Sequence, residues 1–274
     1  KVPMGLISSN WGGTRAEVWV ARDSVMKKPH FVQAIKNSLN TVGLNYNAMI
    51  APIVNYNIAG VLWYQGESNA IRQEDIAEYG VLMKLLVADW RRHWHQADLP
   101  FYWVQLPSIN EPARQFWPEF REVQRQLTTE ITGSGMAVAL DVGTPKDVHP
   151  RNKRPVGERL AALALRDLYG RKDLIAEGPV VIDARQAGKT IRVRFRSADG
   201  LTLVGPSIPL VETRQKGTAN FKAARGMRVE GNELVVETDG LVVELRYAWH
   251  MNAAAAVRNG AGLPAGPFVL KVSE

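Results

Sequence analysis

Up to about residue 170, short apolar segments alternate with longer segments of helical period, and this alternation restricts the fold more than any other feature. The segment IAGVLWYQ (58–65) is apolar without polar alternation, which is typical of a strand covered on both faces. Further strands are predicted at 99–107 and 135–143, and helices at 71–95, 117–131 and 155–170. Strands that alternate with helices predict an α/β fold with a mostly parallel sheet.

The predicted helix at 71–95 carries a single apolar stripe. The stripe consists of Ile76, Tyr79, Met83, Leu86, Trp90 and Trp94. This spacing predicts packing against the core, so we interpret the tryptophans as core residues. In the helix at 155–170, Pro155 suits the first turn and Gly170 the end. Two earlier segments give weaker signals, since 2–8 resembles a short buried strand and 31–50 a helix.

From about residue 172 the pattern changes to short alternating segments rich in Val, Ile and Thr. Gly, Asp and Asn interrupt them in ADGL, EGNE and TDGL, as these residues do at turns between antiparallel strands. We therefore expect an antiparallel β-sandwich domain after the α/β core. The predicted domains are residues 1–174 and residues 175–274.

Composition argues against several classes of protein. At 274 residues, the chain is long enough for one large or two ordinary domains. Its net charge is +7, but the basic residues are spread over the whole chain, so we expect no nucleic-acid binding. The absence of cysteine excludes disulfides, a thiol nucleophile and a cysteine-ligated metal. No apolar run approaches the roughly 20 residues of a membrane span, so none is expected.

Three predicted strands end in unusual polar or glycine-rich segments. In an open α/β sheet, ligands bind beyond the carboxyl ends of the strands, so these segments should face one crevice. The first is SNWGGT, where Gly12 and Gly13 could either form a tight turn or point backbone N–H groups at a developing anion. The last is the loop DVHP, where Asp147 stands two residues before His149. An Asp and a His so placed could be ordinary loop residues or the base half of a hydrolytic triad.

The middle segment, QGESN, follows the strand at 58–65. The amide of Gln65 could donate a hydrogen bond to an oxyanion without bringing charge. Glu67 is interpreted as a structural acceptor that supports the neighbouring loops, and Asn69 as a possible cap of the next helix. No histidine or carboxylate cluster suggests a metal, and no glycine-rich phosphate loop is present. Together, the three strand ends favour acyl-transfer chemistry.

Five segments carry a family resemblance. They read GLISSNWGGTRAEVW, GVLWYQGESNA, LPFYWVQLP, DVHPRNKRPVGERLA and LRYAWHMN followed by GLPAGPF. In this order, and nearly end to end, they resemble the sialate O-acetylesterase family and related carbohydrate acetylesterases of the SGNH hydrolases. The resemblance implies a flavodoxin-like three-layer core with an attached β-sandwich. It also implies removal of acetyl groups from sugars by a serine nucleophile, with no cofactor.

The resemblance also implies roles for single residues. Gly12, or its neighbour Gly13, corresponds to the glycine that supplies an oxyanion-hole N–H. Gln65 is the first choice for the side-chain amide of that hole, and Asn69 the second. His149 corresponds to the general base and Asp147 to its orienting acid. Many SGNH enzymes space the two as Asp-x-x-His, so another carboxylate could orient His149 here. Trp11 could stack on a sugar ring or serve as a core residue.

The family's nucleophile lies in a Gly-Gln-Ser-Asn-Met segment upstream of the WGGT turn, and this chain contains no such segment. We therefore expect the serine, with the first strand of the core, on an amino-terminal fragment of the same enzyme that acts as a partner. Ser9 in ISSN is the one local substitute.

The substrate is expected to be an acetylated saccharide, and sialic acid, xylan and xyloglucan all stay open. By resemblance the protein would be secreted or periplasmic, although the chain itself shows no signal peptide. Two other functions stay open as well. One is a non-catalytic carbohydrate-binding or structural module, and the other is an SGNH acyl hydrolase acting on a different ester.

Overall fold

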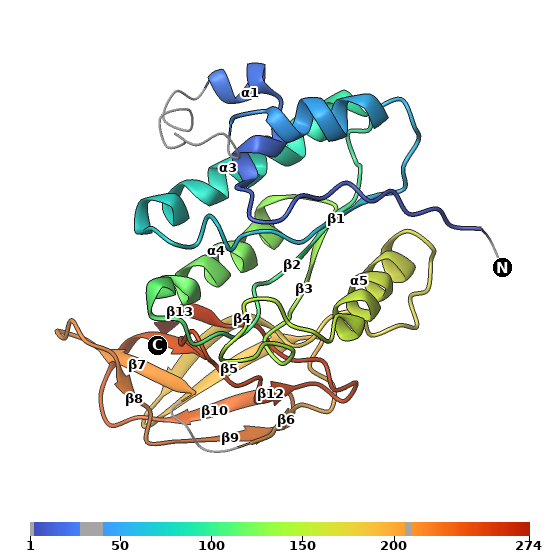
Figure 1. Cartoon of the computed structure of the whole chain (residues 1–274). Coiled ribbons are helices and arrows are strands. Elements are labelled where there is room, and N and C mark those ends of the chain that lie inside the picture. Colours follow the sequence, from blue (N-terminus) through green and yellow to red (C-terminus); the bar gives the residue numbers. More distant parts are fainter. Residues whose placement is uncertain (1–2, 28–40, 206–209) are drawn as a thin grey trace.

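The computed structural model describes residues 3–27, 41–205 and 210–274. An α/β core comes first and a curled β region second (Figure 1). The core elements are η1 (Ala16–Trp19), α1 (Arg22–Met26), η3 (Tyr46–Ile50), η4 (Ala51–Ile53), β1 (Val61–Trp63), α3 (Gln73–His93), β2 (Phe101–Val104), η5 (Pro112–Arg114), α4 (Trp117–Glu130), β3 (Ser134–Ala137) and α5 (Arg154–Asp167). The alternation of strands and helices confirms the predicted fold class.

The core sheet has the order β1-β2-β3, and both of its pairings are parallel. The central strand, β2, is buried along its whole length because helices cover both faces of the sheet. Its Phe101 and Trp103 join the hydrophobic cluster that α3 and α4 complete. Tyr102 and Val104 point the other way, into the cluster that α5 completes. The result is a three-layer arrangement, with the carboxyl ends of the strands at one edge.

The apolar stripe predicted for α3 lies wholly in the first of these clusters. Pro155 lies in the first turn of α5, as predicted. The end of that helix also agrees with the prediction, because Gly170 adopts a φ of +71° three residues beyond Asp167, the last helical residue. Helices α3, α4 and α5 therefore each bury apolar side chains against the sheet.

Two early predictions do not fit the structure. The buried strand expected at 2–8 is wrong for its described part, because Met4, Leu6 and Ile7 are 67%, 86% and 54% exposed and lie in no strand. A strand needs a ladder partner, and no described residue pairs with this segment. The helix expected at 31–50 lies partly outside the described residues, and its end is the π-turn η3 followed by the 3₁₀ turn η4.

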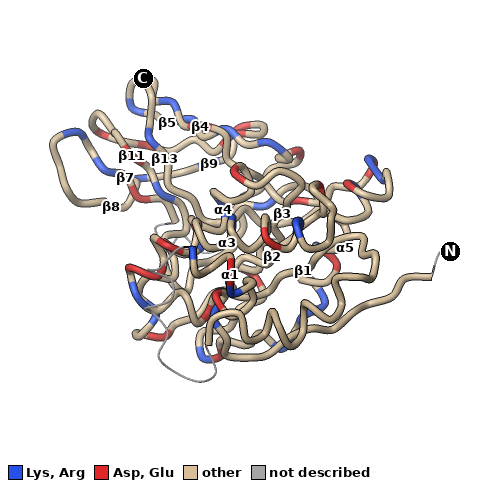
Figure 2. The backbone as a smooth tube through the Cα atoms, turned by 90° about the horizontal axis from the view of Figure 1, so that it is seen from above, with Lys and Arg blue, Asp and Glu red and all other residues tan. Residues whose placement is uncertain are grey.

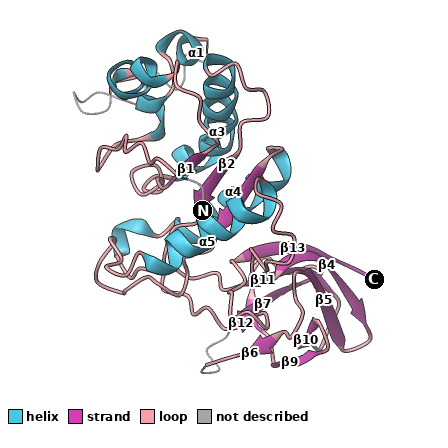
Figure 3. Cartoon of the chain, turned by 90° about the vertical axis from the view of Figure 1, so that its right-hand side faces the viewer, coloured by secondary structure: helices cyan, strands magenta, loops and turns pink. Residues whose placement is uncertain are grey.

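The β region consists of β4 (Val180–Ala187), β5 (Thr190–Arg196), β6 (Thr202–Leu203), β7 (Val211–Gln215), β8 (Lys222–Ala223), β9 (Gly226–Glu230), β10 (Glu233–Glu237), β11 (Val242–Tyr247), β12 (Val257–Arg258) and β13 (Phe268–Ser273). Eight of these form one sheet of order β8-β7-β11-β13-β4-β5-β10-β9, and β12 pairs with β6. All pairings are antiparallel except β13 with β4. The sheet curls around its own core (Figure 3).

Side-chain alternation explains the curled sheet. In β5, Ile191, Val193 and Phe195 point inward, while the arginines between them are exposed. These arginines pair with acidic residues of neighbouring strands, as Arg192 does with Glu233 at 2.8 Å. Basic and acidic residues are interspersed over both parts of the molecule, so the net charge is not gathered on one face (Figure 2).

The change from helices to antiparallel strands falls between Asp167 and Val180. The domain boundary at 174 stays a prediction. Of the helices in the described ranges, none is both long and apolar enough to cross a bilayer.

Candidate active site

The side chain of Gln65, just beyond β1, joins two of the predicted loops. Its Nε2 donates to the carbonyl oxygen of Thr14 at 3.1 Å and to Oδ1 of Asn69 at 2.8 Å. Its Oε1 accepts a hydrogen bond from the hydroxyl of Tyr79 at 3.3 Å. Gln65 is 8% exposed, so both amide hydrogens are already engaged inside the protein. Its assignment to the oxyanion hole stays a prediction, and it would require one of these hydrogen bonds to be exchanged.

Asn69 is 1% exposed and ties the QGESN segment to the start of η1. Its Oδ1 accepts from the backbone N–H of Ala16 at 3.0 Å, and its Nδ2 donates to Glu17 at 3.0 Å. Helix α3 begins at Gln73 with Arg72 at its N-cap position, so Asn69 does not cap it. The predicted capping role is therefore wrong. The side chain braces the loops instead, because it lies three residues before the N-cap position.

The glycine turn lies at the surface, beside the QGESN segment. Gly12 and Gly13 are exposed, and a Cβ at either position would meet no atom within 4 Å. Gly13 has a φ of +74°, which favours glycine, and its carbonyl oxygen accepts from the hydroxyl of Ser68 at 3.2 Å. Trp11 is 58% exposed, so it is not a core residue. The turn thus offers backbone N–H groups and one accessible aromatic ring.

Glu67 is half-buried near three basic side chains. Burial raises the pKa of its carboxyl above the usual value. The hydrogen bond from its own backbone N–H and the charges of His149, Lys153 and Arg114 offset only part of that rise. Arg114 also donates to the Glu67 carbonyl oxygen at 2.8 Å, which anchors the loop. Glu67 therefore links the QGESN segment electrostatically to the loop that carries His149.

Two residues of this cluster were not predicted from the sequence. Lys153 places its Nζ 4.5 Å above the ring of Tyr64 and 3.3 Å from its hydroxyl. Burial lowers the pKa of Lys153, and the charges of Glu67 and Asp147 oppose that change. Tyr64 directly precedes Gln65 at the end of β1, and Lys153 follows His149 by four residues. Tyr64 and Lys153 could have been predicted from these positions beside the motifs.

The loop between β3 and α5 presents Asp147 and His149 to solvent. The two side chains are 42% and 82% exposed. Oδ1 of Asp147 accepts the backbone N–H of His149 at 2.8 Å and lies 3.8 Å from its Nδ1, which is too long for a hydrogen bond. No hydroxyl among the described residues is a hydrogen-bond partner of the imidazole. The roles of this pair stay predictions.

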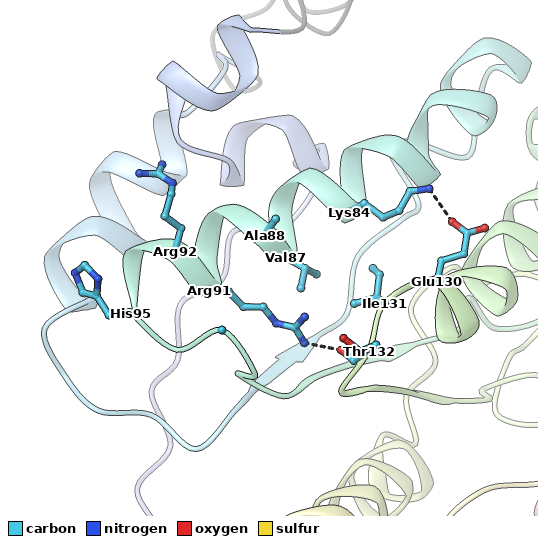
Figure 4. A pocket seen from close by; sticks show the side chains of 10 residues that line it. Lys84, Val87, Ala88, Arg91, Arg92, His95, Glu130, Ile131 and Thr132 are labelled. Atoms are coloured by element: carbon cyan, nitrogen blue, oxygen red, sulfur yellow. Dashed lines mark hydrogen bonds and ion pairs between the residues drawn. The ribbon is translucent and has the colours of Figure 1, made fainter.

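A pocket in the described part of the chain lies away from this cluster. It is a groove of about 730 Å³ beside the end of α3 and the turn after α4, near the amino ends of β2 and β3 (Figure 4). Two of its cations are engaged, since Arg91 donates to Thr132 at 2.7 Å and Lys84 pairs with Glu130 at 2.7 Å. Ligands of α/β sheets bind at the opposite edge, so we assign no function to this groove.

Comparison with solved structures places the fold among carbohydrate esterases. A novel carbohydrate acetylesterase from Xanthomonas citri superposes with a TM-score of 0.83 and 30% identity, over 95% of this chain and 59% of that chain. The expected SGNH-type core with a β domain is thereby confirmed. The family model described as carbohydrate esterase, sialic acid-specific acetylesterase, matches residues 1–166. The chain belongs to this family.

Curated relatives carry the same description. The sialate O-acetylesterase of Mus musculus is 27% identical over 332 residues, which cover 99% of this chain and 61% of the relative. That of Homo sapiens is 28% identical over 305 residues, which cover 99% of this chain and 58% of the relative. The chain thus spans about three fifths of the length of the curated relatives that it matches.

Proposed function

We propose that this chain is the part of a carbohydrate O-acetylesterase that supplies the general base, its orienting acid and the oxyanion-hole donors. The observation that carries the proposal is the convergence of the three predicted segments. The glycine turn and the QGESN segment are joined through Gln65 and Ser68. Tyr64, directly before Gln65, accepts a hydrogen bond at 3.3 Å from Lys153, which follows His149 by four residues. The activities for which the relatives are named support acetyl esters of sugars as the substrate class.

The proposed reaction is acyl transfer in two steps. His149 takes the proton of a serine hydroxyl as its oxygen attacks the acetyl carbonyl carbon, and Asp147 stabilises the imidazolium. N–H groups of Gly12 or Gly13, with the Gln65 amide, stabilise the oxyanion. The intermediate collapses to acetyl-serine while His149 returns the proton to the leaving sugar oxygen. Water, deprotonated by His149, then releases acetate and restores the serine.

The 3.8 Å separation between Asp147 and His149 is compatible with this mechanism. Hydrogen bonds between catalytic groups are often long without substrate and shorten in the Michaelis complex. The two side chains lie on one short loop, so a small rotation of the imidazole brings Nδ1 within hydrogen-bond distance. Trp11, exposed on the glycine turn, is the proposed stacking surface for a sugar ring.

The serine would come from an amino-terminal segment of the same enzyme. Two surface features support this part of the proposal. Strand β1 pairs only with β2 among the described strands, and its Leu62 is 56% exposed at the open edge. An unpaired strand edge is a template for a further strand. Residues 3–10 also expose several apolar side chains without a strand partner, which a covering segment would bury.

A reconstitution experiment tests the proposal. The chain is prepared alone and together with an amino-terminal segment that carries the family's serine, and acetate release from an aryl acetate and from acetylated sugars is measured. Activity is expected only for the combination, with a fluorophosphonate probe labelling the added segment. Stoichiometric labelling of Ser9 in the chain alone would contradict a separate serine. Binding of acetylated sugar by the combination without acetate release would favour a non-catalytic module. Acetate release from the aryl acetate but not from acetylated sugars would favour an acyl hydrolase that acts on a different ester.

A further inference from the structure

The turn 107–110, which follows β2, lies between the His149 loop and a segment of the β region. On one side, the backbone N–H of Asn110 donates to the carbonyl oxygen of Pro145 at 2.9 Å. On the other side, the N–H of Ile109 donates to the carbonyl oxygen of Met251 at 3.1 Å. The turn therefore touches both a loop proposed to be catalytic and a segment more than 100 residues further along the chain.

Ser108 lies at the centre of this contact and is 4% exposed. Its hydroxyl lies 3.0 Å from the carbonyl oxygen of Leu140 and 2.7 Å from that of Ala253, so one proton is shared between two acceptors. Leu140 begins the segment that leads from β3 to His149. Ala253 belongs to the β region, between β11 and β12. The single hydroxyl thus connects the two segments.

The contact also involves close backbone packing. A Cβ on Gly143 would lie 2.2 Å from the carbonyl oxygen of Ser108 and 2.4 Å from its nitrogen. No side chain fits there, so the backbone of the His149 loop rests directly on the backbone of the turn. At the far end of the loop, Val148 packs against the main core cluster, as does Met251 of the β region.

Arg121 on α4 contacts the turn and is fully buried. Its guanidinium donates to the carbonyl oxygens of Leu106, just before the turn, and of Pro107 on it. It also donates to those of His250 and Met251 of the β region. Burial lowers the pKa of this group, and no carboxylate is among its hydrogen-bond partners. A buried guanidinium is costly unless its donors are satisfied, so the four carbonyl oxygens must stay in place.

We propose that Ser108 and Arg121 are positioning residues through which the segment 250–253 of the β region fixes the His149 loop. The inference rests on the proposed function, because it assigns the β region a part in placing the general base. Neither residue touches the reacting atoms. Their effect is to keep the start of the loop, at 140–145, in one conformation. Misplacement of a catalytic group by about 1 Å can lower a rate about a hundredfold.

The test uses Ser108→Ala, which removes the bridging hydroxyl and leaves the core filled. The matched control is Ser134→Ala, since the hydroxyl of Ser134 also donates to a backbone carbonyl, that of Ile131 at 2.6 Å, at the other end of the sheet. In the enzyme that carries the serine segment, Ser108→Ala should lower kcat by about ten- to a hundredfold with KM nearly unchanged. Ser134→Ala should stay within about twofold.

Amide hydrogen exchange of the chain gives a readout that does not need activity. Ser108→Ala should accelerate exchange in 141–149 and in 250–253, whereas Ser134→Ala should not. Arg121→Lys, which keeps the charge but loses the fork of donors, should act like Ser108→Ala if it folds. Unchanged exchange in 141–149 for Ser108→Ala would overturn the proposal, as would unchanged kcat in an active enzyme. If the wild-type enzyme releases no acetate, the proposed function fails, while the exchange result still decides whether the loop is held in this way.

Discussion

The side chain of Asp147 is hydrogen-bonded to the backbone of His149 and not to its imidazole. The carboxylate accepts the N–H of His149 at 2.8 Å, whereas its Oδ1 lies 3.8 Å from Nδ1. The carboxylate therefore has a structural task in the loop in addition to its proposed task as orienting acid. A substitution at Asp147 can separate the two tasks.

His149→Ala should lower kcat/KM for an aryl acetate by about 10³-fold or more, because the general base is lost. The melting temperature should stay nearly unchanged, since the side chain is 82% exposed. His95→Ala is a suitable control, because that side chain is exposed and lies just after α3, away from the His149 loop. Near-normal turnover of His149→Ala would exclude His149 as the base.

Asp147→Asn keeps an oxygen that can accept the backbone N–H of His149, so the loop should hold its shape. The negative charge is lost, and turnover should fall by about tenfold or more because the imidazolium is no longer stabilised. The measurement is kcat on the same aryl acetate, with exchange of the loop amides as a check on its shape. Full activity would mean that another carboxylate orients His149, and Glu67 would then be the first to test.

Gln65→Ala and Asn69→Ala distinguish the two amides proposed for the oxyanion hole. Loss of a donor that acts in the transition state lowers kcat by about 10²–10³-fold and changes KM little. We expect this result for Gln65→Ala. Asn69→Ala should mainly lower stability, because it leaves Ala16 N–H and Glu17 without their buried partner. Steady-state kinetics and thermal unfolding of both variants decide the assignment, and a change in KM alone for Gln65→Ala would contradict it.

Gly66→Ala should destabilise the fold by about 2–4 kcal/mol. Gly66 has a φ of +151°, and a Cβ there would lie 2.5 and 2.8 Å from two ring carbons of Phe120. The control is Gly157→Ala in α5, where a Cβ meets nothing within 4 Å and alanine should stabilise by about 0.5–1 kcal/mol. Urea unfolding measures both changes. Equal stability of the two variants would mean that the loop at Gly66 rearranges freely.

The half-buried ion pairs of Asp141 should make part of the stability depend on pH. Burial opposes ionisation, but hydrogen bonds from Arg159 and the charges of Arg159 and Arg258 hold the pKa of Asp141 below its usual value. The bidentate pair with Arg159 measures 2.7 Å at both contacts, and Arg258 reaches the same carboxylate at 3.2 Å from the β region. A lowered folded-state pKa means that the contribution is complete above the unfolded pKa of about 4 and is lost as the pH falls through the folded value.

Asp141→Asn should therefore be less stable than the wild type by roughly 1–3 kcal/mol at pH 7, and the difference should shrink below about pH 4. Urea unfolding at pH 7 and pH 3 measures it. Asp173→Asn, which breaks a surface pair with Arg171, should show a much smaller difference at both pH values. A wild-type advantage over Asp141→Asn that is the same at both pH values would show that the carboxylate does not titrate in this way.

The sequence was sufficient to predict elements whose burial follows a regular period. Strands β1, β2 and β3 and helices α3, α4 and α5 all lie within the predicted ranges or one residue beyond, because an apolar stripe or run is itself the cause of the packing. Residues 2–8 have the same apolar composition, yet the described part is exposed. An apolar composition shows that a segment could be buried in a strand. Whether a partner strand is present depends on the rest of the fold.

Site predictions were limited by a different cause. The three polar or glycine-rich segments could be found because turn and polar residues follow apolar runs, and the first two are indeed joined by hydrogen bonds. The partners of the Gln65 amide could not be found, since Thr14 lies 51 residues away and Tyr79 on the next helix. The role of Arg121 could not be predicted, because an arginine in a helix normally reaches solvent. The sequence around it does not indicate four buried carbonyl acceptors.

Two of the four carbonyl oxygens around Arg121 come from the carboxyl-terminal half of the chain. Residues 175–274 therefore cannot be exchanged for an unrelated module as if the join were a flexible tether. A chimera would have to present carbonyl groups equivalent to those of His250, Met251 and Ala253 at the same points. Otherwise the Arg121 guanidinium and the Ser108 hydroxyl would each lose part of their acceptors inside the core. For protein engineering, the two parts of the chain should therefore be kept together. The acceptors that join them are main-chain carbonyl oxygens, which a comparison of side chains would not reveal.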